Sequence, residues 1–153
     1  MIDATKHPPK DIAGYDPTVF QGEYSYDYFT AELAVQFIEK HCCHIKGRLA
    51  GSQLVMEDWQ ADFVRTLFGW KRQDNTRRYR QSFVFLPRKN GKTLLLAAIA
   101  NLMMFVERFK SPGAELYCAA SSRDQAALLF DVAAGMVRQN EKLAKKSKII
   151  KSY

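Results

Sequence analysis

Residues 82–106 constrain the fold more than any other part of the chain. An apolar run at residues 82–86 is followed by a polar turn at residues 87–91 and by an apolar segment of helix length at residues 92–106. Aromatic and β-branched residues predict a strand for the first run, and a helix that is apolar nearly all round is predicted to be buried. A strand, a tight turn and a buried helix in this order indicate an α/β fold with a parallel sheet and flanking helices.

Apolar periodicity also predicts the elements on either side of this unit. These elements are helices at residues 28–44, at residues 57–68 and from a cap at Ser122 or Asp124 to about residue 146, and strands at residues 114–120 and from Ile149. Residues 1–27 hold many Pro, Gly and Tyr residues and show no sustained periodicity. A flexible N-terminal arm is therefore predicted for that segment.

The composition limits the classes of protein to which the chain can belong. Hydrophobic residues make up 47% of the 153 residues and charged residues 25%, which excludes a disordered chain, a collagen-like repeat and a disulfide-stapled miniprotein. The longest uncharged run, residues 93–106, is too short to cross a bilayer, so no membrane partner is expected. Cys42, Cys43 and Cys118 are expected to be reduced thiols in the cytoplasm, because no secretory signal precedes them.

The net charge of +7 comes from two short segments rather than from the whole chain. Residues 71–80 and 142–151 are strongly basic, and the remainder is close to neutral. Basic segments of this kind attract polyanions such as double-stranded DNA, but a solvated loop or helix face has the same composition. The sequence leaves both interpretations open.

Gly91, Lys92 and Thr93 are the residue types that bind nucleotide phosphates at the start of a helix. Glycine lets the backbone approach the phosphates, whose charge is met by successive backbone N–H groups and the helix N-terminus. A lysine adds a point charge, and a threonine hydroxyl coordinates Mg²⁺. The usual pattern has a glycine where Leu86 stands, and Pro87 removes one backbone donor. The alternative is a turn between strand and helix that carries a lysine by chance. A lysine at a helix start is unfavourable because it opposes the helix dipole, so its presence here favours a nucleotide site.

Several motifs resemble, in the same order along the chain, the large terminase subunit of tailed bacteriophages, the ATPase motor and nuclease of viral DNA packaging. They are Leu54-Val-Met-Glu-Asp-Trp-Gln60, Phe68-Gly-Trp70, Arg77-Arg-Tyr-Arg80, Phe85-Leu-Pro-Arg-Lys-Asn-Gly-Lys-Thr93 and Cys118-Ala-Ala-Ser-Ser-Arg-Asp-Gln-Ala126. The resemblance implies a P-loop NTPase-like fold of the helicase type, with an additional strand in its parallel sheet. It identifies residues 28–153 as the N-terminal part of a terminase-like ATPase domain.

The resemblance also assigns roles to individual residues. It implies that Gln60 hydrogen-bonds the adenine edge, that Trp59 packs beside it, and that Arg88 neutralises charge on the γ-phosphate as a cis-acting arginine finger. Arg88 and Lys92 are then the catalytic residues, and Thr93 is the Mg²⁺ ligand. The full set expected to contact ATP and Mg²⁺ is Trp59, Gln60, Arg88, Lys89, Asn90, Gly91, Lys92 and Thr93.

By this resemblance the chain is expected to be the ATP-binding part of a motor that couples ATP hydrolysis to DNA translocation in the cytoplasm of a bacterial host. Double-stranded DNA, the phage portal, the small terminase subunit and further copies of the chain are the implied partners. The family's apolar strand ending in Asp-Glu does not follow Thr93, and no acidic nuclease cluster is present. We therefore expect a truncated ATPase domain that binds nucleotide at most when it is by itself.

Two alternative functions remain open at this point. One is another helicase-like P-loop ATPase. The other is an inactive prophage remnant that acts only as a basic nucleic-acid-binding protein.

The sequence His41-Cys42-Cys43-His44 suggests a zinc site. Neighbouring residues on a helix point about 100° apart, so only His41 and His44 share a face, and the spacing fits no common zinc motif. A partly buried helix end is therefore the preferred interpretation of these residues.

Overall fold

The computed structural model describes residues 23–110 and 112–150, and these residues fall into two compact units. The first unit comprises residues 23–37 and 55–85, and the second comprises the other described residues, 38–54, 86–110 and 112–150. Helix α1 (Tyr28–His41) runs from one unit into the other. Each unit contains its own buried apolar side chains.

The first unit joins two helices through a short antiparallel ribbon. Strand β1 (Tyr24–Tyr26) directly precedes α1, and strand β2 (Trp70–Arg72) directly follows helix α2 (Asp58–Gly69). The backbone N–H of Asp27 donates to the carbonyl oxygen of Gly69 at 2.8 Å. The ribbon therefore fastens the beginning of α1 to the end of α2.

Apolar residues spaced four apart create the buried face of α2. Val64 and Phe68 are both fully buried, as the helical periodicity predicts. Gly69, the last residue of the helix, leaves room for its neighbours: an added Cβ would lie 2.6 Å from the ring of Tyr26 and 2.9 Å from the Cβ of Ala31. A larger side chain at this position would push β1 and α1 away from the end of α2.

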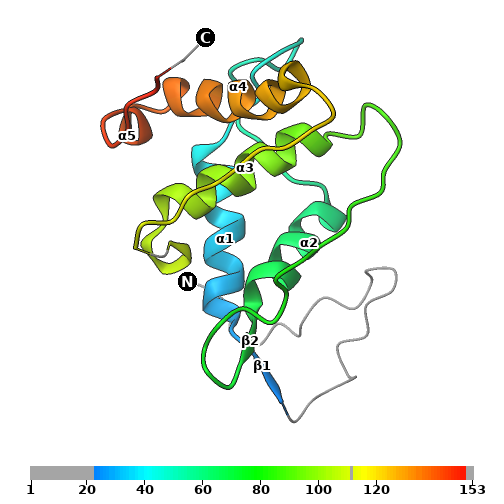
Figure 1. Ribbon diagram of the computed structural model, residues 1–153, viewed down its shortest axis with the longest axis vertical. Coiled ribbons are helices and arrows are strands. Elements are labelled where there is room, and N and C mark those ends of the chain that lie inside the picture. The colour runs from blue at the N-terminus through cyan, green and yellow to red at the C-terminus, as the bar shows by residue number, and fades with distance from the viewer. Residues whose placement is uncertain (1–22, 111, 151–153) are drawn as a thin grey trace. The chain divides into compact units, whose positions relative to one another are not determined.

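The second unit is built mainly from two helices that pack on each other, α3 (Lys92–Phe105) and α4 (Arg123–Gln139) (Figure 1). A short 3₁₀ helix, η1 (Glu107–Phe109), follows α3, and helix α5 (Glu141–Ala144) follows α4. The packed surface is apolar, as expected for a helix with hydrophobic residues nearly all round. Six residues of α3 are buried, but Leu96 and Met104 are 41% and 45% exposed, so the helix is not buried on all sides as its composition predicted.

One polar side chain, Asn101 of α3, lies inside this packed surface. It is 4% exposed, and its Nδ2 donates to the carbonyl oxygen of Ala133 on α4 at 3.1 Å. A buried amide costs free energy unless it is hydrogen-bonded. The bond therefore satisfies the amide and ties α3 to α4.

The helices predicted at residues 28–44, 57–68 and 92–106 are confirmed as α1, α2 and α3. Helix α1 ends three residues before the predicted end, at His41, and α3 ends one residue early, at Phe105. Of the two caps predicted for α4, Ser122 is the one observed: its hydroxyl accepts a hydrogen bond from the backbone N–H of Gln125 at 3.3 Å, and Asp124 lies in the first turn.

The helix predicted to run to about residue 146 is interrupted, because Asn140 starts a new helix. Its Oδ1 accepts hydrogen bonds from the backbone N–H groups of Lys142 and Leu143, at 3.1 and 3.2 Å. Asparagine competes in this way with the helix backbone and is a strong N-cap. The chain therefore forms α4 and α5 instead of one helix.

The strands predicted at residues 82–86 and 114–120 are wrong, because neither segment forms a strand. The strand predicted from Ile149 lies mostly outside the described residues, of which Ile149 and Ile150 are not in a strand. The parallel sheet is not formed among the described residues, whose sheet is the β1–β2 ribbon. Phe83 and Phe85 are 90% and 85% exposed. Aromatic and β-branched residues suit a pleated surface, but a strand also needs backbone hydrogen bonds from a neighbour. In the described ranges no neighbouring strand supplies them, so residues 82–86 and 114–120 stay outside any sheet and most of their side chains are exposed.

The flexible arm predicted for residues 1–27 lies mostly outside the described residues. The part of it that the structure describes, residues 23–27, contains β1. Considering residues 23–110 and 112–150, no helix combines the length and the apolar composition that crossing a bilayer requires.

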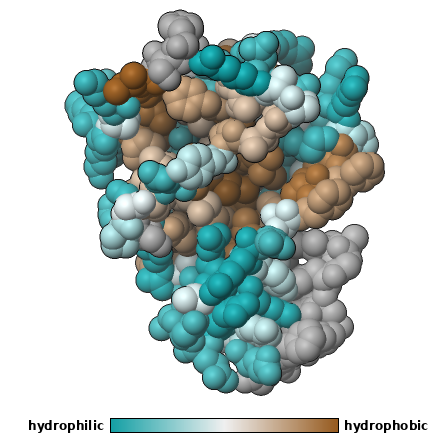
Figure 2. All heavy atoms as spheres, in the orientation of Figure 1, coloured by the Kyte–Doolittle hydropathy of each residue, from teal (hydrophilic) through white to brown (hydrophobic). Residues whose placement is uncertain are grey.

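Exposed apolar side chains occur in the second unit on both of its main helices. They include Leu96 and Met104 on α3 and Leu128 and Phe130 on α4. Figure 2 shows apolar surface over this part of the chain.

Candidate functional site

The turn that leads into α3 has a backbone shape that can bind an anion. Lys89 and Gly91 both have left-handed backbone conformations, with φ of 70° and 71°. Glycine adopts this conformation without steric cost, whereas a lysine seldom does. Backbone N–H groups in turns of this kind point into a shared concavity that suits a negative charge.

The ammonium group of Lys92 is held on the same turn. Its Nζ donates to the carbonyl oxygen of Pro87 at 3.1 Å and also to that of Leu86. A cation at the first position of a helix opposes the helix dipole, and these two carbonyl acceptors offset that cost. No side chain caps α3, because its N-cap residue is Gly91. The lysine charge and the uncapped first turn of the helix therefore lie beside each other.

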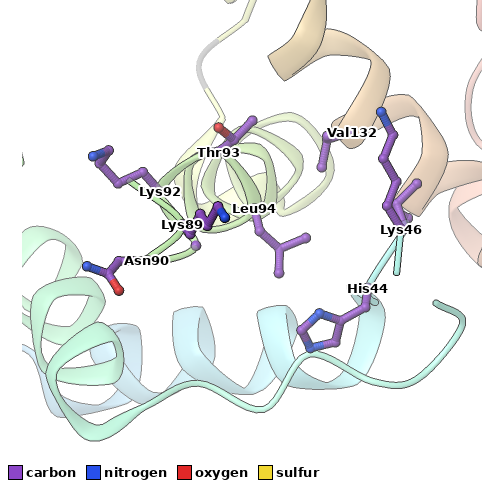
Figure 3. Close-up of a pocket in the computed structure, with 10 residues that line it drawn as sticks. His44, Lys46, Lys89, Asn90, Lys92, Thr93, Leu94 and Val132 are labelled. Carbon is purple, nitrogen blue, oxygen red and sulfur yellow. The ribbon is translucent and has the colours of Figure 1, made fainter. Parts of the chain in front are cut away.

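A cavity of about 300 Å³ lies against this turn, within the second unit (Figure 3). Its volume is at the lower end of the range for small-molecule sites. It is lined by His44, Ile45, Lys46, Lys89, Asn90, Gly91, Lys92, Thr93, Leu94 and Val132. Three of these residues are lysines and none is acidic, so the charge of the cavity favours an anion.

Five of the eight residues predicted to contact nucleotide line this cavity, namely Lys89, Asn90, Gly91, Lys92 and Thr93. Arg88 belongs to the same turn and is exposed, but it is not among the lining residues. Of the other five wall residues, Leu94 directly follows the turn. The sequence analysis did not identify the other four, His44, Ile45, Lys46 and Val132. They are distant from the turn along the chain, and no spacing or motif signals their approach.

Trp59 and Gln60 lie in the first unit, on the first turn of α2. Trp59 is 41% exposed. The Oε1 of Gln60 accepts a hydrogen bond from the backbone N–H of Glu57 at 3.0 Å, as the third residue of a helix does in a capping box. The spacing of Glu57 and Gln60 could have indicated this role. Gln60 therefore has a capping role that the sequence analysis missed, and its predicted contact with adenine stays a prediction.

Arg78, in the basic segment 71–80, is surrounded by aromatic rings of the first unit. Its guanidinium carbon lies 4.2 Å from the ring centroid of Tyr24, 5.0 Å from that of Tyr79 and 5.2 Å from that of Trp70. Such cation–π contacts stabilise the folded chain. The charge of Arg78 is thus directed at the β1–β2 ribbon.

Arg77 also faces an aromatic ring, with its guanidinium carbon 5.5 Å from the ring centroid of Phe68. Burial, reinforced by the nearby charge of Arg80, lowers the pKa of Arg77. Arg72 and Arg80, in contrast, are exposed. The segment predicted either to contact DNA or to be a solvated loop therefore includes two arginines with contacts inside the first unit.

The His41–His44 segment shows helix-end contacts. A ring nitrogen of His41 lies 3.1 Å from Nδ2 of Asn140, and burial raises the pKa of the Cys42 thiol to about 12. In the described part of the chain, no three His, Cys, Asp or Glu residues gather as they would around a metal ion. Cys42, Cys43 and Cys118 are free thiols.

Comparison with known proteins identifies relatives of this chain. A family model described as "Terminase large subunit, ATPase domain" matches residues 58–153. The large terminase subunit of Enterobacteria phage HK97 is 33% identical over 112 residues, which are 73% of this chain and 21% of that protein. The crystal structure of the HK97 bacteriophage large terminase matches with a TM-score of 0.59 and 29% identity, over 80% of this chain and 23% of that one. The chain thus spans about a fifth of the length of these relatives.

The family match covers more than half of the chain and includes α2, the turn before α3, α3 and α4. The structural match agrees with it and shows an α/β fold that resembles the ATPase domain of a terminase. The chain belongs to the terminase large subunit family, within the ATPase domain.

Proposed function

We propose that residues 88–93 bind the phosphates of ATP, and that the chain is the nucleotide-binding part of a phage DNA-packaging motor. The observation that carries this proposal is the lysine-lined cavity against the left-handed turn at the start of α3. A chain of the terminase ATPase family is expected to use nucleotide, and this cavity is the part of the described chain with matching charge and backbone shape.

Each residue of the turn has a role in this proposal. The backbone N–H groups around Gly91 and the N-terminus of α3 surround a phosphate. Lys92 exchanges its bonds to the carbonyl oxygens of Leu86 and Pro87 for charge-assisted bonds to phosphate oxygens. Arg88, exposed on the same turn, neutralises charge on the γ-phosphate.

The cavity supplies only part of a Mg²⁺ site for ATP, because no carboxylate is among its lining residues. This ion usually keeps several waters and takes one or two carboxylates along with substrate phosphates. Thr93 is exposed on the cavity wall, and its hydroxyl is the proposed ligand of the ion. Bound Mg²⁺ would neutralise phosphate charge.

Trp59 and Gln60 are the proposed contacts of the adenine base.

The wider function proposed here is that of the terminase family. ATP hydrolysis would be coupled to movement of double-stranded DNA, with the phage portal and the small terminase subunit as partners, in the cytoplasm of the bacterial host. The family match favours this function over that of another helicase-like ATPase. A protein that only binds nucleic acid is less well supported, because Arg77 and Arg78 face aromatic rings of the first unit.

Calorimetric titration with Mg·ATP tests the proposal. Lys92→Ala is expected to weaken binding about 10- to 150-fold, since a hydrogen bond to a charged group contributes ~1.5–3 kcal/mol. Lys110→Ala is the matched control, because it removes the same charge from an exposed lysine that does not line the cavity. Equal ATP affinity in the unsubstituted chain and the Lys92→Ala variant would contradict the proposed phosphate site.

A further inference from the structure

Part of the cavity wall comes from residues 42–54, a connector between α1 and the segment before α2. The connector folds back on itself: the N–H of His44 donates to the carbonyl oxygen of Ser52 at 2.9 Å, and the N–H of Gly51 donates to that of His44 at 2.8 Å. Cys43 and Gln53 form an antiparallel bridge. The connector is therefore a defined loop, held by its own backbone hydrogen bonds.

The connector is also anchored to α4 through Ile45. A Cβ added to Gly135 would lie 2.8 Å from Cγ2 of Ile45, so the isoleucine side chain packs directly on the helix backbone. Next to it, Nδ2 of Asn140 donates to the carbonyl oxygen of His41 at 3.2 Å. Because Ile45 is anchored, its neighbours His44 and Lys46 have defined places on the cavity wall.

These contacts bring a lysine from a distant part of the chain to the turn before α3. In Figure 3, Lys92 lies on one side of the cavity and His44 and Lys46 lie on the other. Lys46 is exposed, so its side chain can reorient toward a ligand. The ammonium group of Lys92 points away from His44 and Lys46 in Figure 3, held by the carbonyl oxygens of Leu86 and Pro87, so both lysine side chains must turn to bring positive charge to an anion between the two sides.

We propose that Lys46 contacts the phosphate chain of bound ATP from the connector side, across the cavity from Lys92. The inference rests on the proposed function, since it assumes that ATP occupies this cavity. Lys46 does not belong to the Gly91-Lys92-Thr93 turn. It lines the cavity because its neighbour Ile45 packs on Gly135 of α4. It acts as a positioning cation for the phosphates.

The expected effect is modest because Lys46 is exposed. Removal of its charge by Lys46→Gln should weaken ATP binding about 3- to 5-fold at low salt, the upper range for an exposed ion pair. Tripolyphosphate should lose affinity by the same factor, because it carries the phosphate charge without the sugar and the base. Lys46→Arg should restore both affinities by restoring the cation.

The test compares four chains by calorimetry at low salt: unsubstituted, Lys46→Gln, Lys46→Arg and Arg48→Gln. Arg48→Gln is the control, because it removes one charge from the same connector at a residue that does not line the cavity. An equal loss for ATP and tripolyphosphate in Lys46→Gln, with near-normal affinity in Arg48→Gln, supports the inference. A loss for ATP only, no loss at all, or an equal loss in Arg48→Gln overturns it.

The two proposals fail in different ways when this experiment is compared with the Lys92→Ala titration proposed above. If Lys92→Ala weakens ATP binding and Lys46→Gln does not, the phosphate site stands and the role of Lys46 is wrong. If the unsubstituted chain binds neither ATP nor tripolyphosphate, the proposed function is wrong, and the inference about Lys46 is overturned with it.

Discussion

Replacing Gln60 by alanine and by glutamate tests whether its side chain recognises adenine or only caps helix α2. In the structure, Oε1 of Gln60 accepts the backbone N–H of Glu57 at 3.0 Å. Gln60→Ala removes this acceptor. The free energy of unfolding should fall by about 0.5 kcal/mol, the lower end of the net value of a hydrogen bond, because the exposed N–H of Glu57 can bond to water instead.

Adenine recognition predicts a second effect of the same substitution. The glutamine carbonyl can accept from N6 of adenine while its amide donates to N7, whereas guanine presents an acceptor at O6. The mismatch leaves a polar group unpaired at ~1–3 kcal/mol, which corresponds to about 5- to 150-fold in affinity. We therefore predict that the unsubstituted chain prefers ATP to GTP and that Gln60→Ala largely erases the preference.

Gln60→Glu separates the two roles. A carboxylate can still accept the N–H of Glu57, and an acidic residue in the first turn suits the helix dipole, so stability should stay within about 0.5 kcal/mol of that of the unsubstituted chain. The carboxylate has no N–H to donate to N7 of adenine, so the preference for ATP should still be lost.

Competition binding with ATP and GTP measures the preference, and urea denaturation measures the stability of each variant. Loss of the preference in both variants, with lowered stability in Gln60→Ala only, is the expected result. If both variants keep the ATP/GTP ratio of the unsubstituted chain, Gln60 is a capping residue and its assignment to adenine is refuted.

Three further predictions concern catalysis, the aromatic cluster and the thiols. Because no carboxylate lines the cavity to complete a Mg²⁺ site, we expect the 153 residues by themselves to hydrolyse ATP no faster than their Lys92→Ala variant in a phosphate-release assay; robust turnover that the variant lacks would contradict this. Arg78→Ala should lower the free energy of unfolding by about 1–3 kcal/mol through loss of three cation–π contacts, whereas Arg80→Ala should lower it by less than about 0.5 kcal/mol. If the two variants unfold at the same urea concentration, the aromatic contacts of Arg78 do not stabilise the fold. At pH 8, Cys42 should resist alkylation, because burial raises its pKa to about 12 and keeps the thiol protonated, whereas exposed Cys118 should react. Peptide mapping after iodoacetamide treatment measures both reactions, and faster labelling of Cys42 than of Cys118 would contradict the prediction.

The helices could be predicted from local pattern because each one is encoded by its own residues. The periodicity of apolar residues in α1 and α2, the continuous apolar run of α3 and the cap at Ser122 are all local signals. The prediction failed within the last helix, where Asn140 could be either a helix residue or a cap. Its hydrogen bonds, including the one to the carbonyl of His41, decided between them.

The strands could not be predicted in the same way, because a strand depends on a neighbour. Residues 82–86 and 114–120 have the composition of strands, but they pair with no other segment in the described ranges. Conversely, the sequence pattern predicts no strand at Tyr24–Tyr26 or Trp70–Arg72, yet these segments form β1 and β2 because the chain brings them together.

For the candidate site, the sequence by itself determined the turn, the lysine, the threonine and the start of the helix, because these residues are consecutive and their chemistry follows from their order. It also determined the terminase family, through motifs that lie in order along the chain. Only the tertiary structure decided that Lys46 and His44 line the same cavity, because their positions depend on the packing of Ile45 on Gly135. It also decided that Arg78 faces aromatic rings, and that Gln60 caps a helix, because both outcomes depend on which partner each side chain reaches in the folded chain.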